Sequence, residues 1–144
     1  MRTIKFRGQR TDTKELVYGH LAILKGVFYI VVDNEAIVDM SSEGKLFSLI
    51  MVKPETVGQF TGLNDANGNP IYEGDIVNMH TKRYGDEIFR IAYEDSHLGA
   101  FSLCTDDVYS RFVCIFGKDY GYEPYYCEVI GNIHDNPELL KNNY

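Results

Sequence analysis

The sequence predicts a mainly β protein whose C-terminal part forms a small curved barrel. Of its 144 residues, 13% are aromatic, with eleven Tyr, eight Phe and no Trp, and this composition favours sheets over helices. Short apolar runs rich in β-branched residues alternate along the chain with clusters of Gly, Asn, Asp and Ser, which is the pattern of strands joined by turns. A chain of this length buries about two-thirds of its unfolded surface on folding, so it needs neither a metal nor a disulfide for stability.

The N-terminal part predicts a β-hairpin lobe. Residues 4–6 form a short opening strand, and residues 16–24 and 27–32 form two longer strands joined by a turn at Lys25-Gly26. The strand at 27–32 is a nearly continuous apolar run, which indicates a strand covered on both faces. These strands should therefore pair as a buried hairpin.

Two further turn clusters, at 33–35 and 41–44, bracket the apolar residues 36–40. The next strand is predicted over 45–53, where Pro54 ends it because proline cannot donate a hydrogen bond to a ladder. The chain has no linker-like stretch, so we expect a single domain over 1–144 with a soft internal break near residue 53.

The segment from Val57 to Val77 is the densest in turn residues. Asn67-Gly68 predicts a tight reversal, because both residues tolerate positive φ and the Asp65 carboxylate can accept a hydrogen bond from the backbone two residues on. Gly74-Asp75 then interrupts a β-prone stretch, where it predicts a bend or bulge in a strand over 72–79. A kinked strand of this kind suits a small curved barrel.

The remaining barrel strands are predicted over 87–93, 100–104 and 126–134, since apolar and polar residues alternate there. One short helix should follow, with Asn136 as its N-cap and Pro137 at its first position.

Three stretches together resemble the phage YopX protein family. The first is the segment from Pro54 to Val77, with its Gln59-Phe60-Thr61-Gly62-Leu63 run and Glu73-Gly74-Asp75-Ile76-Val77; the others are the opening Arg2–Gly8 and the closing Glu128–Leu140. The resemblance implies a phage or prophage protein with an SH3-type barrel, often oligomeric, and without an established activity. It supplies signature residues with a structural role and no catalytic ones: Gln59, Thr61, Gly62, Asp65, Gly68, Tyr72, Glu73, Gly74 and Asp75.

Charge and composition narrow the function classes. Lys and Arg number 14 against 21 Asp and Glu, a net charge of −7, so nucleic acid is repelled at long range and is an unfavoured partner. Basic residues interrupt any apolar core in a leader, and no apolar run approaches the ~20 residues that span a bilayer, so we expect a cytoplasmic protein of the host cell. The odd number of cysteines fits a reducing compartment with thiols in the core.

Metal sites are disfavoured by spacing. A calcium loop starting at Asp65 needs Gly at its sixth position and Glu at its twelfth, where this chain has Pro70 and Ile76. A zinc site built from His97, Cys104, Cys114, Cys127 and His134 lacks the close ligand pairs typical of structural zinc. We therefore predict no cofactor and no metal.

Catalytic constellations are also weak. Glu43-Gly44-Lys45 downstream of Asp33 or Asp39 resembles the order of a carboxylate-carboxylate-lysine nuclease centre, but a Ser-Ser-Glu-Gly turn would leave these groups solvated and mobile. No nucleotide loop, Ser-His-Asp set or His-Glu-x-x-His motif is present. We predict a protein that is not an enzyme.

The most unusual composition is Tyr120-Gly121-Tyr122-Glu123-Pro124-Tyr125-Tyr126. Exposed tyrosines bury a large area at small entropic cost, so Tyr120, Tyr122, Tyr125 and Tyr126 are candidates for an interface; packing of the same rings on their own sheet is the alternative. The sequence thus favours a self-associating protein that binds a phage or host protein. A nucleic-acid-binding barrel, with a basic patch from Arg2, Lys5, Arg7, Lys82, Arg83 and Arg90, and a small hydrolase with a dispersed site stay as alternatives.

Overall fold

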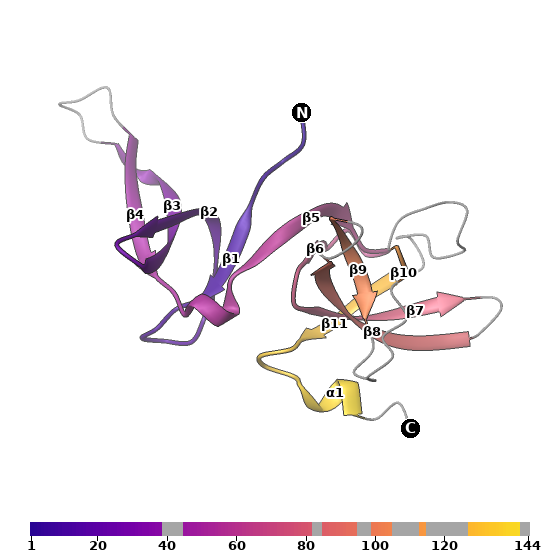
Figure 1. Ribbon diagram of the computed structural model, residues 1–144. Helices are drawn as coiled ribbons and strands as arrows, with labels where there is room; N and C mark the ends of the chain where they lie inside the picture. The colour runs from indigo at the N-terminus through magenta and orange to yellow at the C-terminus, as the bar shows by residue number, and fades with distance from the viewer. Residues whose placement is uncertain (39–44, 82–84, 95–98, 105–112, 115–126, 142–144) are drawn as a thin grey trace. The chain divides into compact units, whose positions relative to one another are not determined.

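The structure is a computed structural model, and it describes residues 1–38, 45–81, 85–94, 99–104, 113–114 and 127–141 (Figure 1). Within these residues the chain is mainly β, with two antiparallel sheets and one short helix, and neither sheet closes into a barrel. The predicted mainly β class is confirmed, whereas the SH3-type closure is not. The chain forms two compact units, Met1–Phe60 and Thr61–Tyr144.

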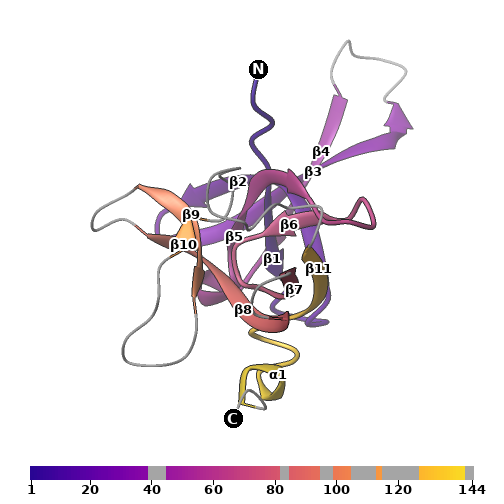
Figure 2. The same ribbon diagram turned by 90° about the vertical axis from the view of Figure 1, so that its right-hand side faces the viewer.

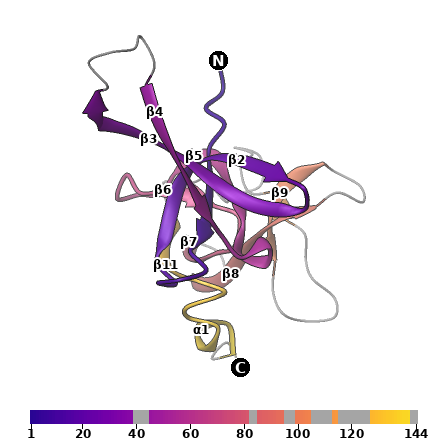
Figure 3. The same ribbon diagram turned by 90° about the vertical axis from the view of Figure 1, so that its left-hand side faces the viewer.

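In the first unit, strands pair in the order β4-β3-β2-β1-β5. The elements are β1 (Phe6–Gln9), β2 (Leu16–Leu24), β3 (Val27–Val38), β4 (Lys45–Met51), the 3-10 turn η1 (Pro54–Thr56) and β5 (Gly58–Asn64), which continues into the second unit. Strands β2, β3 and β4 lie side by side (Figure 3).

The predicted hairpin is confirmed at its turn. Lys25 and Gly26 have φ of 51° and 80°, the left-handed pair that matches the twist of two hairpin strands. The predicted turn at 33–35 is wrong, because β3 runs on to Val38. The pairing of β3 with β4 shifts register between Asp33 and Val38, because β3 has more residues there than β4 has partners for them. Strand β3 therefore continues through this stretch.

The first unit has a small core. Ile30 and Val52 are almost fully buried, and a Cβ added to Gly8 would lie 2.9 Å from Val52. The Thr56 hydroxyl accepts a hydrogen bond from Gln9 N at 2.9 Å, which fastens η1 to the end of β1.

The second unit holds a five-stranded sheet in the order β10-β9-β8-β7-β11. The elements of the unit are β6 (Pro70–Tyr72), β7 (Asp75–Thr81), β8 (Gly85–Glu94), β9 (Ala100–Cys104), β10 (Val113–Cys114), β11 (Cys127–Asn132) and α1 (Glu138–Lys141). Strand β6 is the neighbour of β5 and does not belong to the five-stranded sheet. Figure 2 shows β8 running beside β9. The strand predicted over 72–79 is split in two, because a turn at Glu73-Gly74 separates β6 from β7.

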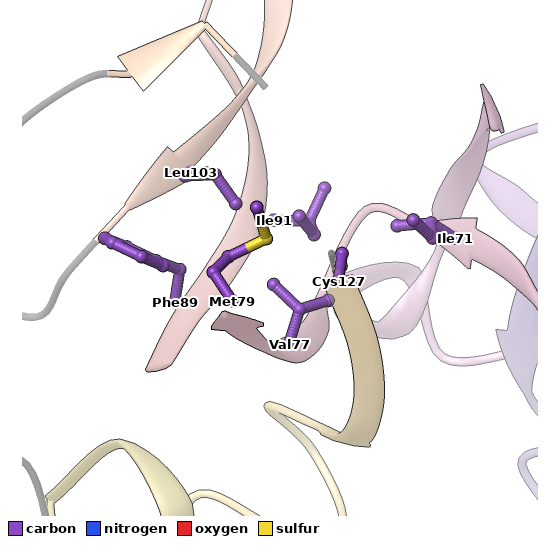
Figure 4. Close-up of a cluster of buried hydrophobic side chains, with 7 residues drawn as sticks. All are labelled: Ile71, Val77, Met79, Phe89, Ile91, Leu103 and Cys127. Atoms are coloured by element: carbon purple, nitrogen blue, oxygen red, sulfur yellow. The ribbon is translucent and has the colours of Figure 1, made fainter. Parts of the chain in front are cut away.

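The core of the second unit is a cluster of apolar side chains from β6, β7, β8, β9 and β11 (Figure 4). Each is at most 4% exposed, and the members are Ile71, Val77, Met79, Phe89, Ile91, Leu103 and Cys127. Burial of a side chain of this size contributes roughly 1.5–3 kcal/mol, so this cluster is the main source of stability in the unit.

The short terminal helix is present as predicted. Its start differs in detail, because the Asn136 side chain accepts from Asn132 N at 3.3 Å instead of capping a helix N–H. The Asn136 backbone carbonyl accepts from Leu139 N at 3.1 Å, and Leu140 is buried. In the part of the chain that the structure describes, no helix is both long and apolar enough to cross a membrane.

Candidate interaction surface and the signature turn

One face of the β2–β3–β4 sheet is apolar and open; we call it the outer face. Ladder register places its residues in rows, because residues directly opposite each other in an antiparallel pair lie on the same side of the sheet. Its members among the described side chains are Tyr18, His20, Ala22 and Leu24 on β2, Val27, Tyr29 and Val31 on β3, and Phe47, Leu49 and Met51 on β4.

Exposure of this face is high for apolar side chains. Phe47 is 59% exposed and Leu49 54%, while Ser48 and Ile50, on the other side of β4, are half-buried. Together, the exposed parts of Phe47, Leu49, Met51, Leu24 and Tyr18 amount to on the order of 500 Å². The largest apolar patch on a monomeric protein has a similar area and is often functional.

The prediction that the run at 27–32 is covered on both faces is wrong. Ile30 is fully buried, but Tyr29 and Val31, which lie on the outer face, are only half-buried. A sheet with one covered face leaves alternate residues open whatever their hydrophobicity. The alternation of Phe47, Leu49 and Met51 with Ser48 was the sequence signal for this face, and it was missed.

In the second unit, the Asp65 carboxylate organises the turn over residues 65–69, which we call the signature turn. One oxygen, Oδ1, accepts from Asn67 N at 2.9 Å and Asn69 N at 2.8 Å. The other, Oδ2, accepts from Val129 N at 3.0 Å and from the Asn69 side chain at 3.3 Å. The predicted turn is confirmed, and Asp65 additionally ties it to β11.

These hydrogen bonds set the ionisation of Asp65. Burial alone raises the pKa of its carboxyl, but the hydrogen bonds from Val129 N, Asn69 and Asn67 N favour the carboxylate and together bring the pKa below its ordinary value of 3.8. Both oxygens are already engaged by donors, so Asp65 serves as a turn anchor.

The bend at Gly74-Asp75 is a second backbone junction. Asp75 is 1% exposed, and its Oδ2 accepts from Tyr72 N at 2.8 Å. Gly74, at φ 89°, donates its N–H to Ile91 O at 2.8 Å and accepts from Ile133 N at 2.9 Å. The turn therefore connects β8 with the end of β11.

The other signature residues lie along the same path. The Thr61 hydroxyl donates to Ile71 O at 2.9 Å, and Gly62 and Gly68 have φ of 90° and 82°, a conformation that favours glycine. Gln59 pairs with Phe6 on β1, and Glu73 is half-buried in the turn before β7.

The thiols of the second unit are shielded. Cys104 and Cys127 are buried, as predicted for core cysteines. Burial raises the pKa of Cys127 to about 12, and the negative charges of Asp65, Asp75 and Glu128 add to the rise. In the described residues, no group of three His, Cys, Asp or Glu side chains could hold a metal ion.

The basic residues named for a nucleic-acid patch differ in exposure. Arg7 is only 6% exposed, whereas Arg2 and Lys5 are exposed, and Lys5 Nζ lies 5.9 Å from the centre of the Tyr18 ring. Arg90 is half-buried on β8.

Several predicted sites lie outside the described residues. These are the tyrosines Tyr120, Tyr122, Tyr125 and Tyr126, the nuclease-like Asp39 and Glu43, the zinc candidate His97, and the basic residues Lys82 and Arg83. The predictions made for them stay predictions.

Known proteins resemble the chain in sequence and in fold. A family model described as YopX protein matches residues 5–141. The crystal structure of protein EF1440 from Enterococcus faecalis resembles the chain with a TM-score of 0.53 and 24% identity, and the match covers 97% of this chain and 99% of that one. No curated protein matches.

Proposed function

This chain belongs to the YopX protein family, and from that premise we propose that it is a phage or prophage accessory protein without catalytic activity, which self-associates and binds a protein partner in the host cytoplasm. The observation that carries the proposal is the outer face. Phe47, Leu49 and Met51 expose about half of their surface on one strand, and exposure of this kind favours association with another protein surface.

The chemistry of the described side chains supports a binding role. The two buried carboxylates, Asp65 and Asp75, accept hydrogen bonds from the backbone and so have a structural role. The raised pKa of Cys127 keeps its thiol protonated at neutral pH, whereas a nucleophile requires the thiolate.

The charge distribution favours a protein over a nucleic acid as the partner. Charged residues beside the outer face include Asp33, which pairs with Phe47 in the β3–β4 ladder, and Lys5, whose Nζ lies 5.9 Å from the centre of the Tyr18 ring. The chain carries a net charge of −7, which repels a phosphate backbone at long range.

Light scattering over a concentration series tests the proposal. The wild-type chain should exceed the monomer mass at micromolar concentration, and Phe47→Ser should weaken association at least about tenfold, because interface anchors of this size contribute roughly 1–2 kcal/mol or more. Ile130→Ser, at a 37% exposed site on β11, is the matched control and should leave the mass unchanged. A strictly monomeric wild type that also captures no host or phage protein would overturn the proposal.

A further inference from the structure

Strand β4 has an outer edge that is occupied at one end and open at the other. Met51 O accepts from Thr11 N at 3.2 Å, and Lys53 N donates to Gln9 O at 2.9 Å, so the chain before β2 covers the edge from Met51 onward. Val52 N points the other way and donates to Phe28 O at 3.0 Å.

This alternation fixes the direction of the remaining backbone groups. Since Met51 and Lys53 present their groups away from β3, the N–H and C=O of Lys45, Phe47 and Leu49 point the same way. Strand β4 is terminal in its sheet, and the described part of the chain contains no strand beyond residues 45–49. The edge there is ready to pair.

The open edge has little of the protection that natural edges carry. Proline, charged side chains, bulges and inward-pointing charges normally prevent pairing with another chain. Lys45 is the one charged residue between positions 45 and 49, and from Phe47 to Met51 the strand has no proline and an unbroken register with β3. A neighbouring strand would meet Phe47 and Leu49 as exposed apolar partners.

We propose that residues 45–49 of β4 pair antiparallel with the same residues of a second copy, around a two-fold axis at Phe47. This inference rests on the proposed self-association and names its interface. A two-fold pairing closes the open edge of both copies at once, whereas a foreign strand on one copy would leave the other edge of that strand unpaired.

The position of the axis follows from the geometry. With the axis at Phe47, the two Phe47 rings lie across from each other and Lys45 faces Leu49 of the other copy, so no like charges meet. An axis at Ser48 would require the Met51 carbonyl, which Thr11 N already occupies. An axis at Leu49 would place Lys45 opposite Lys53 and oppose like charges.

The paired sheets would place the two outer faces on the same side. Antiparallel partners share a face, so the open rows of β2, β3 and β4 become continuous across the axis. Pairing at the edge therefore leaves the apolar area free and enlarges it for a protein partner.

A pair of variants at one position tests the edge. Leu49→Pro removes the outward N–H but spares the groups of Ser48 and Ile50, which point to β3, whereas Leu49→Ser keeps the N–H and loses the apolar side chain. We expect sedimentation equilibrium to show at least a tenfold weaker dimer for Leu49→Pro and a smaller loss for Leu49→Ser, with circular dichroism unchanged. If the Leu49→Pro variant dimerised as strongly as the wild type, the edge pairing would be overturned, whereas the proposed self-association would still stand.

Amide hydrogen exchange on the wild-type chain tests the same interface without a substitution. The amides of Phe47 and Leu49 should exchange at least tenfold more slowly at a concentration that favours the dimer than at a dilute one, while amides of the Lys25-Gly26 turn stay constant. Equal exchange at both concentrations would overturn the inference, as would protection that arises only on addition of a different protein.

Discussion

The two compact units use their apolar residues in opposite ways. In the second unit, β6, β7, β8, β9 and β11 direct apolar side chains into one cluster in which every member is at most 4% exposed. In the first unit, Ile30 and Val52 are buried, but the outer face keeps Phe47 and Leu49 more than half exposed. The exposed part of an apolar side chain contributes nothing to the stability of the isolated chain, because that area is not removed from water. The comparison teaches that the second unit supplies a stable fold and the first supplies a surface.

Thiol reactivity should separate the two units most widely. The pKa of about 12 for Cys127, against an ordinary 9.0, reduces its thiolate fraction at neutral pH by about 1,000-fold, and burial slows attack further. A cysteine introduced by Leu49→Cys on the outer face should react with a maleimide or iodoacetamide at an ordinary rate. Mass spectrometry of a labelling time course measures both sites in one sample.

In urea, Cys127 should become as reactive as the introduced cysteine, because unfolding removes its burial. Fast labelling of Cys127 in the native chain would contradict the closed core.

Core truncation should give the largest stability difference. Ile91→Ala removes a 1% exposed side chain from the cluster and should lower the free energy of unfolding by about 3–4 kcal/mol, the transfer and cavity cost of such a change. Leu49→Ala is the matched control and should cost under about 0.5 kcal/mol in dilute solution, where the chain is monomeric. Urea unfolding followed by circular dichroism measures both. Equal losses of unfolding free energy in the two variants would contradict the difference between the units.

Loss of the Asp65 carboxylate should lower the free energy of unfolding by an intermediate amount. Asp65→Asn places a donor where the carboxylate accepts, and loss of hydrogen bonds to a charged group should cost about 2 kcal/mol at neutral pH. The folded pKa is depressed, so this contribution is complete above the ordinary value of 3.8 and is lost as pH falls through the folded value.

The gap in stability between wild type and Asp65→Asn should therefore close in acid. Urea titrations at pH 7 and at progressively lower pH below 4 measure it. A gap independent of pH would show that Asp65 acts by shape alone.

Replacement of a turn glycine that has positive φ should give the smallest loss of stability. Gly68 has φ 82° and open space where a Cβ would lie, so Gly68→Ala meets strain without a clash and should cost about 1 kcal/mol. Gly26→Ala in the β2–β3 turn, at φ 80° and equally open, should cost a similar amount. Thermal melts of the two variants compare the units directly, and a neutral Gly68→Ala would remove the conformational reason for this signature residue.

Much of the fold was predictable from local chemistry. The strand limits at 16–24 and 100–104 agree with β2 and β9, because turn residues bound them closely. The Asp65-Asn67 hydrogen bond was predictable for the same reason, since it joins residues that are neighbours in the chain.

Long-range features were not predictable in the same way. The bond from Val129 N to Asp65 joins distant segments, and the continuation of β3 through Asp33 depends on a register shift with β4. The candidate surface was missed because an apolar strand has the same local pattern whether one of its faces is covered or both are.

The Asp65 carboxylate also has a consequence for the time course of folding. Its bonds to Asn67 and Asn69 can form as soon as that short loop has been synthesised, but the bond to Val129 spans 64 residues. Strand β7 lies between β8 and β11, so the sheet stays incomplete until β11 has left the ribosome. Closure of so long a loop is slow compared with local turns. The nascent chain should therefore hold a formed turn in which Asp65 Oδ2 accepts only from the Asn69 side chain, and the second bond, from Val129 N, forms when the last strand docks.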